Sequence, residues 1–208
     1  MGAKPRVCVW CAETCEALSI FRGFHREGIS NICFSPDGQA SGTSPSFFNL
    51  VVSIGEDPAH SVAVFHWRSR STLFTAPSGP EPVLDSHMID ENMFVSCGVD
   101  HVRFWTRTDG PFEVDQGIFG RKGALQPMLC CSSLGDDNAK IVLTGSTSGH
   151  MYVWEGRNCT SCIKAHAGAL TTMIVMRYAL ATGSADGNIK LWTSSLEMAR
   201  CIDVKALG

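Results

Sequence analysis

The sequence predicts an all-β fold of the β-propeller type, in the form of an incomplete arc of about four blades and part of a fifth. Five short segments of similar pattern each end in an aromatic residue, and these residues, Trp10, Phe65, Trp105, Trp154 and Trp192, lie between 38 and 55 residues apart. A unit of about 40 residues is the length of a four-stranded propeller blade. No segment shows sustained helical periodicity, which favours strands throughout.

The segment that ends in the aromatic residue is expected to form the third strand of each unit. The three positions before the aromatic are apolar, variable and apolar, as in VCV before Trp10, VRF before Trp105 and IKL before Trp192. This alternation gives a strand one recurrent face that can pack against a core.

Each complete unit also contains candidates for its other strands. Runs such as ISNICFS, PMLCCSS and ALTTMIVM would form first strands, and NLVVSIG, MFVSCG, KIVLTGS and YALATGS would form second strands, with Gly or Asp turn signals between them. Segments such as STLFTA and SCIKA would form outer strands. The expected boundaries are 1–22 for the end of a truncated blade and 23–75, 76–118, 119–164 and 165–208 for four blades, which together make one partial propeller domain.

The composition excludes several classes of protein. The 208 residues are 44% hydrophobic and 18% charged, so the chain can bury a sizeable core. A net charge of -3 gives no global reason to expect nucleic acid or an anionic membrane as the main partner. No apolar run approaches the roughly 20 residues of a membrane span, and the first residues lack the apolar stretch of a secretory signal. We therefore expect a cytoplasmic protein with no nucleic-acid partner, no membrane and no cofactor.

The ten cysteines are interpreted as reduced thiols. Half of them lie in apolar, strand-like runs, namely Cys8, Cys33, Cys97, Cys130 and Cys131, and not at the loop spacings of a secreted disulfide scaffold. Two CxxC pairs, Cys8 with Cys11 and Cys159 with Cys162, raise a zinc site as an alternative. Residues three apart on a strand point to opposite faces, so each pair would need a turn to converge on one metal. We expect no metal site.

Two acidic motifs could suggest catalysis. Asp100 and His101 lie together in GVDHVRFW, but His101 sits four residues before its aromatic, as His150 and Asn188 do in later repeats. Residues that recur at one position of successive blades are spread around the arc and do not converge. Asp136 and Asp137, in SLGDDNAK, lie in a polar stretch between two strands, where a hairpin loop is expected. We therefore predict that the chain is not an enzyme.

The last repeat resembles the WD-repeat family residue by residue. GSADGNIKLW has the shape of that family's turn and third strand, and AHAG lies where the family places its histidine. The resemblance implies a buried hydrogen-bond tetrad made of His166, Thr182, Asp186 and Trp192. A catalytic triad is the alternative, but Thr is a poor nucleophile without special activation. The tetrad is favoured because an indole donor fits a network that ties strands together.

A closer resemblance covers nearly the whole chain. The segments Phe65 to Arg68, Cys97 to Trp105 and Gly117 to Gly123 follow one another in the order seen in the echinoderm microtubule-associated protein-like family. Phe65 and His66 depart from the tryptophan and the acid that are usual there. The resemblance implies a non-enzymatic scaffold of atypical propellers that binds tubulin, modulates microtubule organisation or stability, and lies on the cytoskeleton. A generic WD-repeat adaptor that does not bind tubulin is the alternative.

Basic side chains are the candidate binding residues, because the outer surface and tails of tubulin are acidic. Arg68 and Arg70 lie in one expected turn, Arg103 and Arg107 flank Trp105, and Arg121 and Lys122 lie in the loop GIFGRKG. The alternative is that all six are solvated surface charges. The loop lacks the GK[ST] ending of a phosphate-binding loop, so we predict no nucleotide site.

The chain is short for a closed ring. Seven blades of about 40 residues need roughly 280 residues, and an open arc exposes strand edges at both ends. The chain could be a fragment, a short isoform, or an arc that another chain completes, and its opening in mid-blade favours the first two. In each case, further blades or a partner chain would be needed to close the ring.

Overall fold

The computed structural model describes residues 4–36, 49–135, 140–176 and 179–207. Within these ranges the chain forms strands β1 to β18 and no α-helix, and one 3-10 turn, η1 (Val204–Leu207), follows the last strand. Every sheet is antiparallel, with its strands in sequence order. The motif Asp136 and Asp137 lies outside the described residues.

The strands are grouped into one pair and four sheets of four strands. The half-blade contains β1 (Arg6–Trp10) and β2 (Ala17–Arg22). The first blade contains β3 (Ile29–Phe34), β4 (Leu50–Gly55), β5 (Val62–His66) and β6 (Ser71–Ala76), and the second contains β7 (Val83–Asp90), β8 (Met93–Gly98), β9 (His101–Thr106) and β10 (Glu113–Gln116). The third blade contains β11 (Met128–Leu134), β12 (Ile141–Ser146), β13 (His150–Glu155) and β14 (Asn158–Lys164), and the fourth contains β15 (Leu170–Met176), β16 (Ala179–Ser184), β17 (Asn188–Trp192) and β18 (Met198–Asp203).

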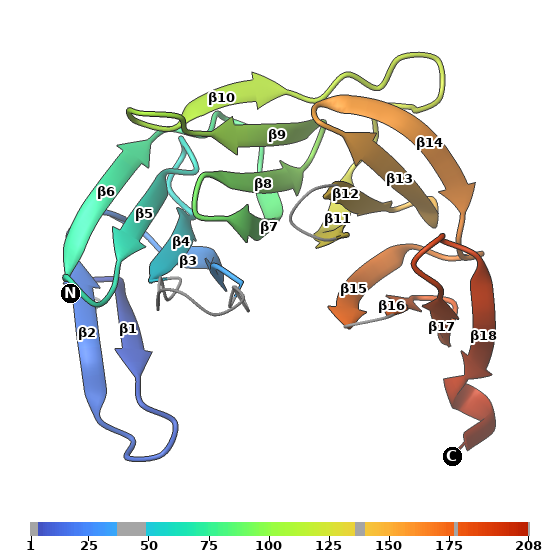
Figure 1. The fold of residues 1–208 in the computed structure, drawn as a ribbon, viewed down its shortest axis with the longest axis horizontal. Coiled ribbons are helices and arrows are strands. Elements are labelled where there is room, and N and C mark those ends of the chain that lie inside the picture. The colour runs from blue at the N-terminus through green and yellow to red at the C-terminus, as the bar shows by residue number, and fades with distance from the viewer. Residues whose placement is uncertain (1–3, 37–48, 136–139, 177–178, 208) are drawn as a thin grey trace, which may run out of the picture.

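The blades lie side by side around an arc that does not close (Figure 1). First strands such as β7 and β11 lie toward the centre, and last strands such as β10 and β14 form the outer rim (Figure 1). The half-blade and the fourth blade stand at the two ends of the open side. The predicted fold, an all-β incomplete propeller of four blades and part of a fifth, is confirmed.

The hydrophobic core lies between neighbouring blades. Trp105 of β9 is buried with Leu50 and Val64 of the first blade, and its ring stacks on Phe94 with the ring centroids 5.3 Å apart. Trp154 and Trp192 are buried in the same way in the next two clusters, where each packs against residues of the preceding blade. Burial of a large apolar side chain stabilises a fold by about 1.5 to 3 kcal/mol. The recurrent aromatics therefore join the blades as well as anchoring their own strands.

Apolar side chains remain exposed at both ends of the arc. The N-terminal end exposes Trp10, Ile20, Ile32 and Phe34, and the C-terminal end exposes Ile174, Met176, Ile189 and Met198. These positions continue the apolar pattern that is buried between blades elsewhere, and no further blade covers them within the part of the chain that the structure describes. No helix in the described ranges is long and apolar enough to cross a membrane.

Candidate binding surface and buried hydroxyl networks

A buried hydroxyl group occupies the same place in the second strand of every blade. Ser53, Ser96, Thr144 and Thr182 each lie opposite the residue two positions before the third-strand aromatic, and all four are buried. In three blades the indole Nε1–H donates to this hydroxyl, over 2.9 Å from Trp105, 3.0 Å from Trp154 and 2.8 Å from Trp192. We did not predict this row from the sequence, although a Ser or Thr one or two residues before Gly in each second strand is its signal.

The four residues expected to form a tetrad lie together in the fourth blade. His166 Nε2 is 2.8 Å from Thr182 Oγ1, which also accepts the indole N–H of Trp192, and His166 Nδ1 is 3.2 Å from Asp186 Oδ2. Burial lowers the pKa of His166, and Asp186 opposes that shift. Burial alone would raise the pKa of Asp186, but backbone N–H groups of Asn188 and Ala167 donate to its carboxylate and hold that pKa well below its usual range.

The Thr182 hydroxyl hydrogen-bonds with several partners, and this excludes a role as a nucleophile. It donates to the carbonyl of Lys190 at 3.4 Å, and it also hydrogen-bonds with His166 Nε2 and with the indole N–H of Trp192. A nucleophile needs a free approach to a substrate, and Thr182 is buried. The set therefore links β16, β17 and the segment before β15 as a structural network.

The first blade carries a related network that sequence reasoning missed. His25 Nε2 is 2.7 Å from Ser53 Oγ, and His25 Nδ1 is 2.8 Å from Ser61 Oγ, which in turn donates to Asp57. His25 stands four residues before β3, as His166 stands four residues before β15, and this spacing was the available signal. Phe65 takes the place of the tryptophan and has no N–H to donate, so His25 supplies the partner of Ser53.

Asp100 and His101 shape the hairpin between β8 and β9. Asp100 has a φ of 58°, in the left-handed region that a tight turn requires. His101 is buried at the start of β9, with Nδ1 2.9 Å from the carbonyl oxygen of Val99, and its Nε2 has no hydrogen-bond partner among the described residues. Burial, assisted by the nearby charge of Arg103, lowers the pKa of His101 to about 4. His150 and Asn188 begin β13 and β17 in the same way, each in its own blade.

Cys159 and Cys162 lie on one face of β14, contrary to the prediction that residues three apart on a strand point to opposite faces. The register of β14 shifts at Thr160, so Cys159 lies opposite Trp154 and Cys162 opposite Tyr152, and both thiols are on one face of the strand. A β-bulge adds one residue and so cancels the usual alternation of faces. Two thiols still supply too few ligands for a structural zinc ion, and the described ranges contain no cluster of three or more His, Cys, Asp or Glu side chains that could hold a metal.

The basic residues of the first blade lie in the turn between β5 and β6. Arg68 donates to the Asn49 side chain and holds its guanidinium 4.6 Å from the centre of the Trp67 ring. Arg70 donates to the carbonyl of Leu18 in β2 at 3.0 Å and has a φ of 57°. Both side chains are exposed, so their charges face solvent while their donors also tie the turn to neighbouring strands.

The two arginines that flank Trp105 are engaged within the second blade. Arg103 is only 12% exposed, pairs with Glu81 at 3.0 Å and donates to Ser78 Oγ at 3.0 Å. Arg107, which directly follows β9, donates to the carbonyl of Glu91 at 3.2 Å, and its guanidinium lies 5.2 Å from the centre of the Phe112 ring. Both guanidinium groups are less exposed to solvent than Arg121 and Lys122 in the loop that follows β10.

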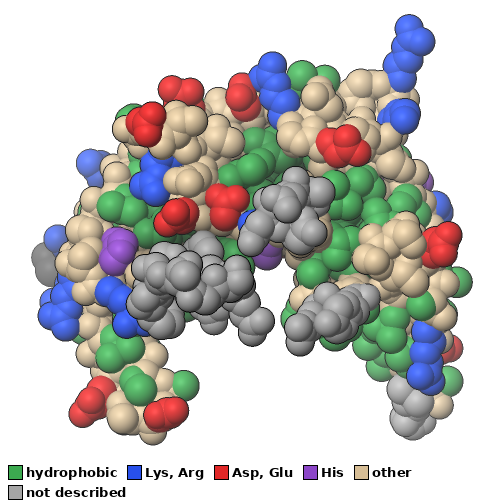
Figure 2. Space-filling view, in the orientation of Figure 1, with side chains coloured by type: hydrophobic (Ala, Val, Ile, Leu, Met, Phe, Trp, Pro, Cys, Tyr) green, Lys and Arg blue, Asp and Glu red, His purple; other side chains and the backbone are tan. Residues whose placement is uncertain are grey.

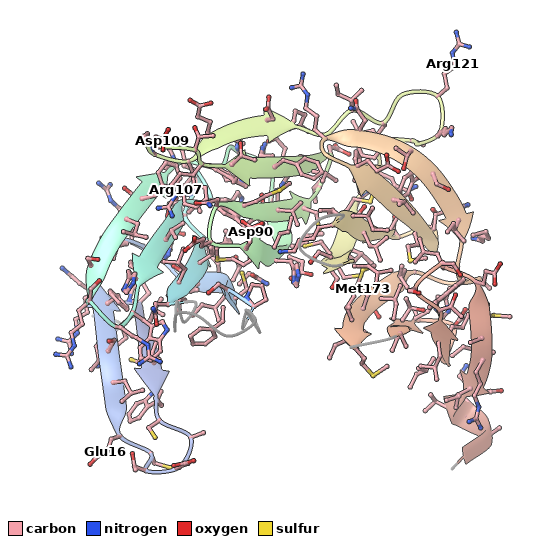
Figure 3. The ribbon with its side chains drawn as sticks, viewed as in Figure 1. Glu16, Asp90, Arg107, Asp109, Arg121 and Met173 are labelled. Carbon is pink, nitrogen blue, oxygen red and sulfur yellow. The ribbon has the colours of Figure 1, made fainter. Side chains whose placement is uncertain are left out.

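Arg121 and Lys122 lie in the connection between β10 and β11. Arg121 is exposed at the tip of this loop and points away from the arc (Figure 3). Lys122 is also exposed, and its Nζ donates to the carbonyl of Thr160 at 2.8 Å. The loop is fixed at its base, where Ile118 pairs with Asn158 of β14 and Gly117 N donates to the carbonyl of Val102 at 2.7 Å. Arg121 is therefore presented by an anchored loop.

The structure does not gather the six basic residues into one patch. Arg68, Arg70 and Arg107 lie in or next to turns between third and fourth strands, whereas Arg121 and Lys122 lie in a connection between two blades. Figure 2 shows basic and acidic side chains interspersed over the visible face. Any binding surface built from these residues is composed of separate contacts from successive blades.

Comparison with known proteins identifies the family. A family profile described as "Echinoderm microtubule-associated protein first beta-propeller" matches residues 1–207. A 77 kDa echinoderm microtubule-associated protein of Lytechinus variegatus is 25% identical over 97% of this chain, and Echinoderm microtubule-associated protein-like 4 of Mus musculus is 29% identical over 97%. The chain spans only 30% and 21% of the lengths of these two relatives.

Solved structures support the same fold. The Myceliophteria thermophila Cps50 (Swd1) β-propeller domain matches 96% of this chain and 66% of its own length, with a TM-score of 0.74 and 15% identity. The C-terminal WD40 domain of Sif2 matches 97% of this chain and 53% of its own length, with a TM-score of 0.68 and 18% identity. The profile match over almost every residue, on a propeller arc of this form, shows that the chain belongs to the echinoderm microtubule-associated protein family.

Proposed function

We propose that this chain is a non-enzymatic, microtubule-associated scaffold that binds tubulin through the surfaces and loops of its blades. The observation that carries the proposal is the match of residues 1–207 to the first propeller of a family named for microtubule association. Propellers bind partners mainly through loops held on a rigid framework. The protein would act at microtubules in the cytoplasm and modulate their organisation or stability.

The loop between β10 and β11 is the best-placed candidate for an acidic partner. Arg121 and Lys122 are adjacent and exposed, and the base of their loop is tied to β14. Arg68 and Arg70 would add a second, separate contact from the β5–β6 turn. We leave Arg103 out of the proposed surface because Glu81 already neutralises its largely buried guanidinium.

Co-sedimentation of the purified 208-residue chain with stabilised microtubules tests the proposal. The chain should pellet with microtubules in a saturable way, and added salt should weaken the binding because solvated charges are screened. A chain that stays in the supernatant even at low salt would leave the adaptor function as the remaining candidate. A pull-down from cytoplasm with depolymerised microtubules would then identify the adaptor's partners.

Charge reversal tests the loop itself. The double variant R121E/K122E should reduce the bound fraction, because two attractive contacts with an acidic surface become repulsive. A matched double variant, R200E/K205E, changes the net charge equally at exposed positions of β18 and η1 and should bind as the unmodified chain does. Equal binding of both double variants at moderate salt would remove the loop from the proposed surface.

A further inference from the structure

Two cysteines, Cys11 and Cys15, lie in the turn between β1 and β2. Cys11 directly follows β1, and Cys15 lies two residues before β2. Cys15 is exposed and Cys11 is partly exposed, and the turn projects away from the other blades (Figure 1). The corresponding turn of the first blade, between β5 and β6, is exposed at residues 68–70, so this position in a blade is open to solvent. Small molecules in solution can therefore reach both thiols.

The backbone of the turn holds the two cysteines close together. Cys11 N donates to the carbonyl of Glu16 at 2.9 Å, and Cys15 N donates to the carbonyl of Cys11, also at 2.9 Å. The second bond joins residues four apart, as in one turn of an α-helix, where the Cα atoms of such residues are about 6 Å apart. Disulfides span roughly 4.4 to 6.8 Å between Cα atoms. Cys11 and Cys15 are thus within disulfide reach.

The CxxC motif does not offer Cys11 a comparable partner. Cys8 belongs to β1 and lies three residues before Cys11. Three residues of a β-strand span about 10 Å, which exceeds the reach of a disulfide. The turn therefore selects Cys15, and not Cys8, as the thiol that can pair with Cys11.

The surroundings of Cys11 favour its thiolate. Hydrogen bonds from the Thr14 side chain, and from the backbone N–H groups of Thr14 and Glu13, lower the pKa of Cys11. Burial has the opposite effect elsewhere, since it raises the pKa of Cys159 and raises that of Cys33 to about 11. The thiolate is the nucleophile in thiol chemistry. Cys11 is therefore suited to attack, with Cys15 as the second thiol.

We propose that Cys11 and Cys15 form a reversible disulfide site that is oxidised by low-molecular-weight disulfides. The thiolate of Cys11 attacks one sulfur of the small disulfide, so a mixed disulfide forms and one small thiolate leaves. The thiolate of Cys15 then attacks Cys11 Sγ, which forms the intramolecular disulfide and releases the second small thiolate. The two protons given up by the cysteines end on the two small thiols. An excess of small thiol reverses both steps. The proposal is independent of tubulin binding.

Two other sets of cysteines in the chain serve as comparisons. Cys201 on β18 is exposed, and its Sγ lies 3.8 Å from Asn188 Oδ1, so it represents a solvent-accessible thiol at a different place. Cys159 and Cys162 share a face of β14, but both are partly buried against the cluster that contains Trp154. We expect Cys201 to stop at a mixed disulfide and the β14 pair to react more slowly than Cys11.

Treatment of the folded 208-residue chain with glutathione disulfide tests the site. After acid quenching and blocking of free thiols, trypsin releases residues 7–22, which contain Cys8, Cys11 and Cys15. This peptide should lose two free thiols together and become lighter by two hydrogen atoms, and excess reduced glutathione should restore it. Further cleavage after Glu13 separates Cys11 from Cys15, so the two fragments should stay joined until the disulfide is reduced.

Single serine variants assign the link to its two residues. Cys8→Ser and Cys201→Ser should form it as the unmodified chain does. Cys15→Ser should instead accumulate glutathione on Cys11, because the second thiol is absent, and Cys11→Ser should form no link. These positions lie outside the buried core or at its edge, and the map of the unmodified chain needs no variant, so a variant that fails to fold does not remove the test.

Three results would overturn the proposal. The first is a peptide 7–22 that keeps all its thiols free while Cys201 carries glutathione. The second is a link that forms equally in Cys15→Ser, because the pair would then be Cys8 with Cys11. The third is a mixed disulfide on Cys11 of the unmodified chain that does not proceed to the intramolecular link, because the turn would then hold the two sulfurs apart.

Discussion

At the scale of single residues, the fold depends on polar groups that are buried but satisfied. Thr182 illustrates this, because one hydroxyl meets the indole of Trp192 and the imidazole of His166. The sequence allowed this set to be expected, since its spacing matches a known repeat. The corresponding set around His25 was missed, because residues 35–49 between β3 and β4 separate His25 from Ser53 by more than the usual distance along the chain.

Removal of the Thr182 hydroxyl should destabilise the fourth blade. Thr182→Val keeps the side-chain shape but leaves the indole N–H of Trp192 and Nε2 of His166 without a partner. An unsatisfied buried polar group costs about 1 to 3 kcal/mol. Urea unfolding should show a loss of that order, whereas Thr108→Val, at an exposed position after β9, should change little. Equal stability of the two variants would contradict the structural role of the network.

His101 should make the protein less stable in mild acid. Its pKa is about 4 in the fold because burial disfavours the charged imidazolium, and the ordinary value is about 6.5. The unfolded chain therefore takes up the proton first as pH falls below about 6.5, and the stability that neutral His101 contributes is lost progressively down to about pH 4. In thermal unfolding at pH 7 and pH 5, His101→Asn should show a smaller drop than the unmodified chain. An identical drop would assign the pH dependence to other groups.

At the scale of elements, the third strand and the turn before it define each blade. The aromatic at the strand end, the apolar alternation and the turn residues were all readable from the sequence, because they follow from strand geometry and from packing between blades. The bulge at Thr160 was not, because nothing in the local pattern distinguishes a bulge from regular alternation. The interactions of Arg103 were also not readable, since Glu81 reaches it from a preceding connection.

The β8–β9 hairpin should be sensitive to the residue at position 100. Asp100 has a φ of 58°, which a β-branched side chain tolerates poorly. Asp100→Val should cost about 1 to 2 kcal/mol, the usual penalty for an L-residue in the left-handed region, whereas Asp100→Gly should be close to neutral because glycine adopts that region readily. Chemical unfolding of both variants tests whether the backbone conformation at position 100 is what stabilises the hairpin. Comparable losses for the Val and Gly variants would indicate that the Asp carboxylate, and not the backbone, matters.

At the scale of the whole molecule, the blades form an arc with two unequal ends. The fourth blade is a four-stranded sheet with an exposed apolar face, whereas in the half-blade β1 pairs, among the described residues, with β2 alone. The number of blades and their order could be predicted from the repeat length. The sequence could not show which backbone groups at a strand edge are unpaired, because their pairing depends on the register of the whole sheet.

The open arc is the central structural claim, and amide hydrogen exchange of the unmodified chain tests it most directly. β1, with one paired edge, should exchange far faster than β9 and β13, which pair on both sides. Local openings with few protected hydrogen bonds need little free energy, whereas strands inside a sheet open only with larger units. We predict rapid exchange along residues 6–10 and slow exchange along 101–106 and 150–155. Protection of β1 equal to that of β9 and β13, in a chain shown to be monomeric, would contradict the open arc.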